Sequence, residues 1–190
     1  IFADEVRARD DVIVRAASDQ SFTFVAAGLG LAGATGAGLS GNVLDLTSWT
    51  NATIGGDLEF GGPSHVAAGG DVALSARDDT NAVLFSGALG IGGANAVAAG
   101  ANIASITKDT TAAIFNASSV EAAGGGVADR AGAPTGLDVS ARSSEDVQSL
   151  AVSGAVSSGL SAGPAAGIIL IDSDTAATIG GFAQINRESS

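Results

Sequence analysis

The 190-residue sequence predicts an all-β fold, a parallel β-helix (β-solenoid) with about 30 residues per rung in 60-residue double-rung repeats. Three observations predict it: an internal repeat, apolar columns with the period of a strand, and a lack of bulky core residues. Hydrophobic residues make up 46% of the chain, but aromatic residues only 4%, and 28 residues are Gly. Such a composition fits a narrow solenoid bore better than a broad layered core.

The repeat runs through most of the chain. Residues 11–60 align without a gap on residues 71–120, at an offset of 60. A third copy begins near Leu137 at an offset of 65, and the five extra residues fall in 124–136, where Gly and Pro indicate a loop. We therefore expect residues 1–190 to be a single solenoid segment of a longer repeat protein, with units of about 11–70, 71–135 and 136–190.

Apolar columns divide each unit into two halves of about 30 residues. Columns two residues apart lie on one face of a strand. The columns of the first strand are Val14, Leu44, Leu74, Ala104, Val139 and Ile169, then Ala16, Leu46, Ala76, Ile106, Ala141 and Ile171. Those of the second strand are Phe22, Ala52, Ala82 and Ala112, then Phe24, Ile54, Leu84 and Ile114. In the third copy, either Ser149 weakens the core or Leu150 replaces it through a one-residue slip.

A polar tripeptide separates the two strands of each half, and we expect it to form a corner. Asp and Thr side chains suit such a position because they bond to nearby backbone groups. The tripeptides are 18–20, 48–50, 78–80, 108–110 and 173–175, with Ser144-Glu145 in the remaining half. Their acids Asp19, Asp79, Asp109 and Asp174 would align along the rod as turn caps, with Ca²⁺ binding as the alternative. The Ca²⁺ repeat G-G-x-G-x-D is absent, since residues 124–129 have Val in the fourth place.

The charge balance excludes several kinds of partner. Eight basic residues, mostly scattered singly, against 20 acidic ones give a net charge of -12, which excludes nucleic acid and repels anionic headgroups. The absence of Cys excludes disulfides and thiolate metal sites. Residues 20–44, 81–107 and 147–171 carry no charge and are long enough to span a membrane. Because they keep the register of the repeat, they indicate an uncharged face that packs against another rod or a lipid surface.

Short motifs assign no functional residue. Gly28–Gly33 matches the dinucleotide pattern G-x-G-x-x-G, but only nine residues separate Gly33 from the next strand, too few for a crossover helix. Gly159–Gly163 matches the G-x-S-x-G elbow without the helix that should follow it, and His65, expected in an exposed loop, is the only His. Chance explains the glycosylation sequons at Asn51 and Asn116. We assign no catalytic, cofactor-binding or metal-binding residue, and no cofactor.

Four strings carry a family resemblance: residues 71–80, 102–114, 137–142 and 171–179. They resemble the repeats of giant secreted bacterial proteins, the leukotoxin-type filamentous adhesins, over nearly the whole chain. The resemblance implies a right-handed β-helix stalk on the outer surface of a Gram-negative bacterium that reaches hosts, neighbours or matrix. Trp49 departs from the pattern, because it occupies the place of a corner Asp. The family offers no catalytic motif.

The expected function is a structural stalk segment of a secreted or cell-surface filamentous adhesin or extracellular fibre, and not an enzyme. No polar cap is visible at either end, so the expected partners are copies of the chain, end to end or side by side. A part of the parent chain outside this sequence would contact host or matrix. Two alternatives stay open: a membrane-active leukotoxin-like segment, and a polysaccharide-degrading β-helix enzyme, for which Trp49 is the sole sugar-stacking indole.

Overall fold

The computed structural model describes residues 5–56, 62–124 and 136–186, which form eleven β-strands and no helix. The strands are β1 (Glu5–Ala8), β2 (Val12–Ala32), β3 (Thr35–Ile54), β4 (His65–Ala68), β5 (Val72–Gly92), β6 (Asn95–Ile114), β7 (Ser119–Ala122), β8 (Leu137–Val156), β9 (Leu160–Ala162), β10 (Ala165–Ile179) and β11 (Gln184–Ile185). Within these residues, no helix is present that could cross a membrane.

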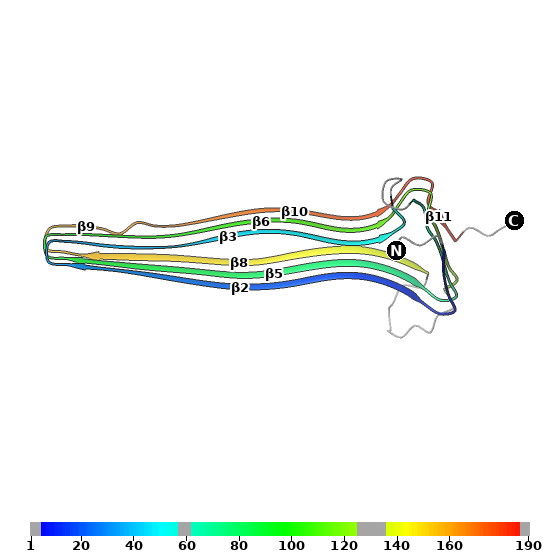
Figure 1. The fold of residues 1–190 in the computed structure, drawn as a ribbon, viewed down its shortest axis with the longest axis horizontal. Helices are drawn as coiled ribbons and strands as arrows, with labels where there is room; N and C mark the ends of the chain where they lie inside the picture. Colours follow the sequence, from blue (N-terminus) through cyan, green and yellow to red (C-terminus); the bar gives the residue numbers. More distant parts are fainter. Residues whose placement is uncertain (1–4, 57–61, 125–135, 187–190) are drawn as a thin grey trace.

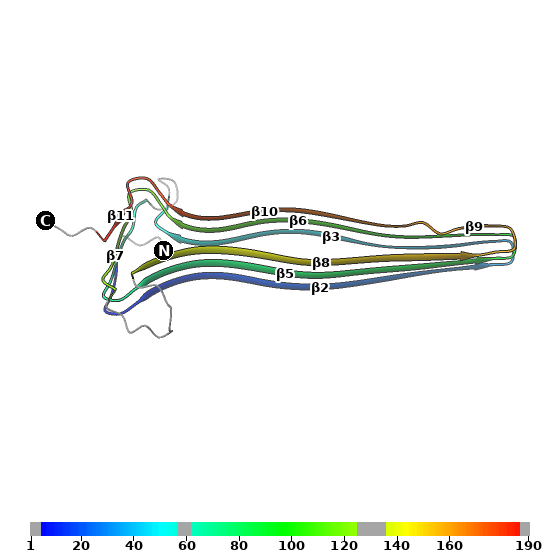
Figure 2. The same cartoon turned by 180° about the vertical axis from the view of Figure 1, so that it is seen from behind.

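The strands form three parallel sheets, and each turn of the chain adds a strand to each sheet. Two sheets are long, β2-β5-β8 and β3-β6-β10, with β9 also paired to β6, and the third is the short sheet β1-β4-β7-β11. The long sheets extend together from the short sheet to a narrow turn (Figure 1), and the short strands stack at one end (Figure 2). We call the long part the blade, the end with the short sheet the base, and the opposite end the tip. This arrangement is consistent with a parallel β-solenoid.

One rung contains 60 residues, and the expected 30-residue rung is not confirmed. Val12 pairs in register with Val72, which pairs with Leu137, so stacked residues are 60 or 65 apart. The two 30-residue halves face each other across the interior, where Gln20 Nε2 donates to Ser48 Oγ at 3.4 Å. The reason is that the chain passes through each polar tripeptide as a strand and reverses near Gly33. Three rungs make a plate about 14 Å deep and about 70 Å long, whereas 30-residue rungs would have made twice as many rungs of half the width.

The repeat is less regular in the short sheet than in the long sheets. His65 pairs with Ser119, only 54 residues further along the chain, whereas Glu5 pairs with His65 at 60. The loop predicted at 124–136 falls largely on residues 125–135, which lie outside the described residues.

The interior is filled in layers from base to tip. The base core consists of Val12, Ala52, Ile54, Val66, Ala68, Val72, Leu74, Ala76, Ala112, Ile114, Val120 and Ala122. A second cluster further along the blade contains Leu44, Ala82, Leu84, Ala104 and Ile106, with Phe22 and Phe24 packed against it. The predicted columns therefore do point inward, but they divide between two clusters. Ser149 keeps its inward place beside Leu84 and Leu150 points outward at 56% exposure, so no slip occurs.

Toward the tip the two long sheets approach backbone to backbone. A Cβ on Gly28 would lie 1.9 Å from the Leu39 carbonyl oxygen, and one on Gly30 would lie 1.8 Å from that of Ala37. No side chain fits between the sheets at these positions, so the inward residues are Gly and Ala. The narrow interior thus accounts for the composition, and the large apolar residues of this region point outward.

Candidate functional site

A layer of polar side chains crosses the interior between the two apolar clusters, and we call it the polar belt. Its members are the first and third residues of the tripeptides expected to be corners and, in the remaining half, Ser143 and Glu145. On β2-β5-β8 they are Ser18, Asp78 and Ser143, then Gln20, Thr80 and Glu145. On β3-β6-β10 they are Ser48, Lys108 and Ser173, then Thr50, Thr110 and Thr175. The corner prediction was wrong because strand alternation continues through each tripeptide and turns these two residues inward.

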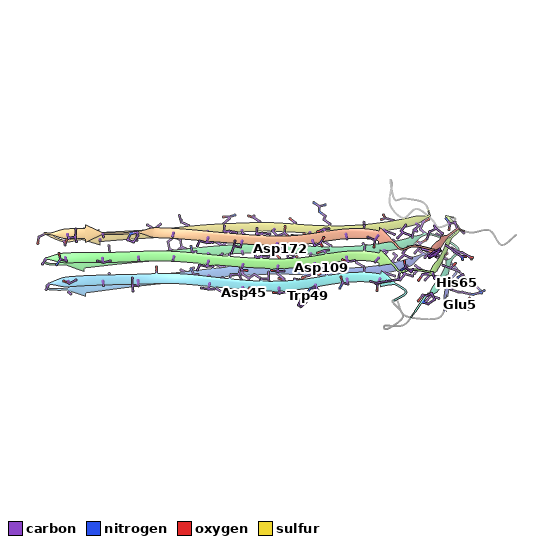
Figure 3. The ribbon with its side chains drawn as sticks, turned by 90° about the horizontal axis from the view of Figure 1, so that it is seen from above. Glu5, Asp45, Trp49, His65, Asp109 and Asp172 are labelled. Carbon is purple, nitrogen blue, oxygen red and sulfur yellow. The ribbon has the colours of Figure 1, made fainter. Side chains whose placement is uncertain are left out.

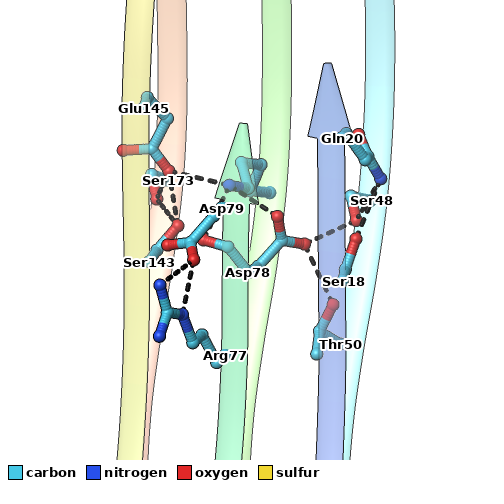
Figure 4. Close-up of polar contacts among 11 residues, drawn as sticks. Ser18, Gln20, Ser48, Thr50, Arg77, Asp78, Asp79, Ser143, Glu145 and Ser173 are labelled. Atoms are coloured by element: carbon cyan, nitrogen blue, oxygen red, sulfur yellow. Dashed lines mark hydrogen bonds and ion pairs between the residues drawn. The ribbon is translucent and has the colours of Figure 1, made fainter. Parts of the chain in front are cut away.

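A buried ion cluster lies at the centre of the polar belt (Figure 4). Lys108 Nζ lies 2.6 Å from Asp78 Oδ1 and 3.2 Å from Glu145 Oε1, with the Lys108 and Asp78 side chains both 0% exposed. Lys108 Nζ also donates to the Asp78 carbonyl oxygen at 3.1 Å. The cluster joins the two long sheets of the middle rung to the third rung. One ammonium here is shared between two carboxylates.

Hydroxyl groups donate further hydrogen bonds to both carboxylates. Asp78 Oδ2 accepts hydrogen bonds from Ser48 Oγ at 2.6 Å and Thr50 Oγ1 at 2.9 Å, both from the first rung. Glu145 Oε1 accepts from Ser143 Oγ and, at 3.2 Å, from Ser173 Oγ in the third rung. The bonds around these two carboxylates therefore connect all three rungs.

Burial and hydrogen bonding oppose each other in setting the charge of the two acids. Burial on its own raises the pKa of Asp78, but hydrogen bonds from Lys108, Ser48 and Thr50 and the charge of Lys108 together lower the pKa below its ordinary value. Burial also raises the pKa of Glu145. The hydrogen bonds from Ser143, Lys108 and Ser173 and the charge of Lys108 lower this pKa, and their combined effect is larger than that of burial. Both acids are therefore ionised at neutral pH.

An asparagine pair forms a second cross-link nearer the tip. Asn42 Nδ2 donates to Asn102 Oδ1 at 3.0 Å and to the Phe85 carbonyl at 2.8 Å. Asn102 Nδ2 lies 3.1 Å from the Leu84 carbonyl and 3.0 Å from that of Leu150. Like the polar belt, this pair bonds across the interior and between rungs.

The acids expected to stack as corner caps lie on the outer faces of the blade. Asp19 and Asp79 are register partners on one sheet, and Asp109 and Asp174 are partners on the other. Trp49, the register partner of Asp109, is 70% exposed on the same outer face. Within the described ranges, no three carboxylate or imidazole groups gather closely enough to hold a metal ion.

Three arginines meet in a shallow basin on the outer face of β2-β5-β8. Arg15, Arg77 and Arg142 line it together with Asp19 and Asp79. Arg77 is ion-paired to Asp79 and stacks in register with Arg142. These three are an exception among basic residues that are mostly scattered singly, and the 65-residue offset already aligned Arg77 with Arg142.

The short motifs occupy structural places in the blade. Gly28 and Gly30 of the G-x-G-x-x-G match face the opposite sheet inside β2. The hydroxyl of Ser161, in the G-x-S-x-G match, contacts that of Ser157 at 2.9 Å in the tip, while His65 lies at the base (Figure 3). His65 begins β4 and is half-buried, so its placement in an exposed loop was wrong. Both sequon residues, Asn51 and Asn116, are exposed.

No protein-family model, no curated protein and no solved structure matches this chain.

Proposed function

We propose that the chain is a structural segment of a secreted or cell-surface bacterial fibre, of the filamentous-adhesin kind, in which rungs stack end to end on further copies of themselves. The observation that carries this proposal is the open face at the third-rung end of the stack. Leu84 in the middle rung is 0% exposed, but Ile169 and Ile171, inward residues of the third rung, are 41% and 48% exposed. Stacking another rung on this end buries them.

The strand edges support the same proposal. β2 and β3 at one end of the stack, and β8 and β10 at the other, each have a long neighbour on one side only. Unpaired edges of this length are templates for strand addition. A like rung offers both the matching hydrogen-bond ladder and the matching inward residues.

The 60-residue rung favours a wide fibre over a thin spacer. Each rung adds only about 4.8 Å along the fibre axis, half the extension per residue of a 30-residue rung. What the longer rung gains is a lateral surface about 70 Å wide. In this proposal the fibre presents a broad face along its length and holds its partners there as well as at its end.

The test is electron microscopy of the purified protein, which should show filaments with an axial spacing of about 4.8 Å. Ile171→Asp puts a charge on the open inward face of the third rung, and we expect it to shorten or abolish the filaments. Leu170→Asp is the matched control, because Leu170 belongs to the same strand but points outward at 60% exposure. Monodisperse single particles from the unaltered chain would contradict the proposal.

The alternative of a polysaccharide-degrading enzyme has one observation in its favour. The arginine basin combines cationic and carboxylate side chains on a concave surface, as recognition of an acidic sugar requires. Trp49 lies on the opposite sheet and adds no stacking surface to it. Release of reducing ends from acidic polysaccharides that is lost on Asp79→Asn would favour this alternative over the fibre.

A further inference from the structure

The half of the blade nearer the tip is apolar on its outside. We call this the distal zone: residues 23–43, 83–103 and 148–168. Its largest outward side chains on the first rung are Val25, Leu29, Leu31, Leu39 and Val43, with exposures between 64% and 71%. On the middle rung the corresponding set is Phe85, Leu89, Ile91, Val97 and Ile103, at 38–40%.

This zone reverses the usual arrangement of large and small residues. At the inward positions nearest the tip, such as Gly28, Gly30 and Gly90, the two backbones touch and leave no room for a side chain, so the bulky residues there have only the outside to occupy. Strands that are apolar on both faces are normally covered on both faces. Contiguous apolar surface of this extent marks a site of contact with a protein or a membrane.

The shape of the surface restricts what can cover it. Apolar residues lie on both outer faces, Leu29 on one sheet and Leu39 on the other, and both faces reach the same tip. A second blade packed face to face covers one of these faces and leaves the other in water. A hydrocarbon layer surrounds both faces at once.

The charges and the length of the zone match such a layer. The charged residues closest to the tip are Asp45 on one outer face and Asp146 on the other. Asp146 lies in the same register position as Ser21 of the first rung. Asp45, Asp109 and Asp172 all lie between mid-blade and base (Figure 3). From Thr23 to the tip turn at Gly33, the blade extends about 33 Å. The hydrocarbon core of a bilayer is about 30 Å thick.

We propose that the distal zone inserts tip-first into the hydrocarbon layer of a zwitterionic lipid bilayer, while the charged half of the blade stays in water. The acids at its boundary repel anionic headgroups, which sets the preference for zwitterionic lipid. The inference rests on the proposed function in one respect. Unpaired backbone groups at the edges of β2, β3, β8 and β10 would be costly in lipid, and the stacking of further rungs pairs them.

Flotation of the assembled protein with phosphatidylcholine vesicles tests the insertion. Leu29→Asp places a charge in the distal zone, and Ile13→Asp is its matched control. Both residues point outward from β2, at 64% and 63% exposure, and they differ in their distance from the tip. We expect Leu29→Asp to reduce vesicle binding at least tenfold and Ile13→Asp to leave it unchanged. Equal effects of the two, or stronger binding to phosphatidylglycerol vesicles, would overturn the proposal.

Tryptophan fluorescence measures the depth of insertion. Trp49 lies beyond Asp45 toward the base, so brominated acyl chains should not quench it. In a Trp49→Phe background, Leu39→Trp should be quenched and its emission should shift to the blue. Filaments that form without lipid but never float with vesicles refute the insertion and leave the fibre standing. Lateral pairs that Leu29→Asp dissolves, again without flotation, would identify a second copy as the occupant.

Discussion

Replacing Lys108 by Met is the most informative single perturbation of the polar belt. Met keeps the apolar stem and much of the volume of Lys, so the variant removes the charge with little change in packing. Asp78, whose side chain is 0% exposed, and Glu145, at 16%, are then left without a counter-ion. Breaking a buried pair in this way costs about 3–5 kcal/mol. Asp78 keeps its bonds from Ser48 and Thr50, which puts the expected cost near the lower figure, about 3 kcal/mol.

Thermal and urea unfolding at neutral pH, followed by circular dichroism, measure this cost. For a chain of this size, about 3 kcal/mol corresponds to a fall in Tm of about 6–12 °C. Arg7→Met is the control, since the Arg7–Glu5 pair is 74% and 49% exposed and such pairs contribute about 0–1 kcal/mol. A loss on Lys108→Met no larger than that on Arg7→Met would refute the buried cluster.

A triple variant separates the stability of the cluster from its specificity. Asp78→Leu, Lys108→Met and Glu145→Leu together remove all three charges, and such replacements are often neutral or stabilising. We expect stability to return but the rungs to slide by two residues. Disulfide formation detects this, because Cys at 13 and 73 are register partners and Cys at 13 and 75 are not. Failure of the 13/75 pair to oxidise in the triple variant would contradict a role in register.

The remaining predictions concern pH, packing and metal ions. Folding lowers the pKa of Asp78 and Glu145, so in acid the unfolded chain binds more protons than the folded chain. The stability that the two acids provide is therefore complete above about pH 5 and lost as the pH falls below about 4. Glu145→Gln should make the free energy of unfolding depend less on pH across that range. Gly90→Ala, whose Cβ would lie 2.3 Å from the Val97 carbonyl oxygen, should cost about 1–3 kcal/mol or more in urea unfolding, and Gly33→Ala, with nothing within 4 Å, about 0.5 or less. A chelator should leave Tm unchanged, and a fall in Tm would support Ca²⁺ binding at the outer acids.

The sequence predicts the sheets of this fold better than its rungs. Period-two alternation correctly identifies the inward residues, because it depends only on strand geometry. The 60-residue offset also gives the register of the long sheets. The half-repeat of 30 residues was misinterpreted as a rung because two stacked strands and two facing strands leave the same periodic signal. What separates them is the place where the chain reverses, and the glycines there resemble those elsewhere in the chain.

The polar belt was missed for a different reason. Charged residues are rarely buried, so Asp78 and Lys108 indicate a turn when each is considered alone. They are stable inside the blade only as a pair, and the pairing depends on the two half-repeats facing each other. One sign was available: Ala76, Asp78, Thr80 and Ala82 continue the alternation, with no Gly or Pro to break the strand.

The polar belt supplies a register signal that the apolar layers of the interior lack. Near the tip, Gly and Ala stack on Gly and Ala, and a rung displaced by two residues makes nearly the same contacts. Strands of this composition specify their register weakly. In the belt, the same displacement moves Lys108 of the middle rung away from Glu145 of the third rung, and Asp78 away from Ser48 and Thr50 of the first rung. The belt and the Asn42–Asn102 pair therefore discriminate between registers that the apolar layers tolerate, and a fibre of many like rungs needs that discrimination at every rung.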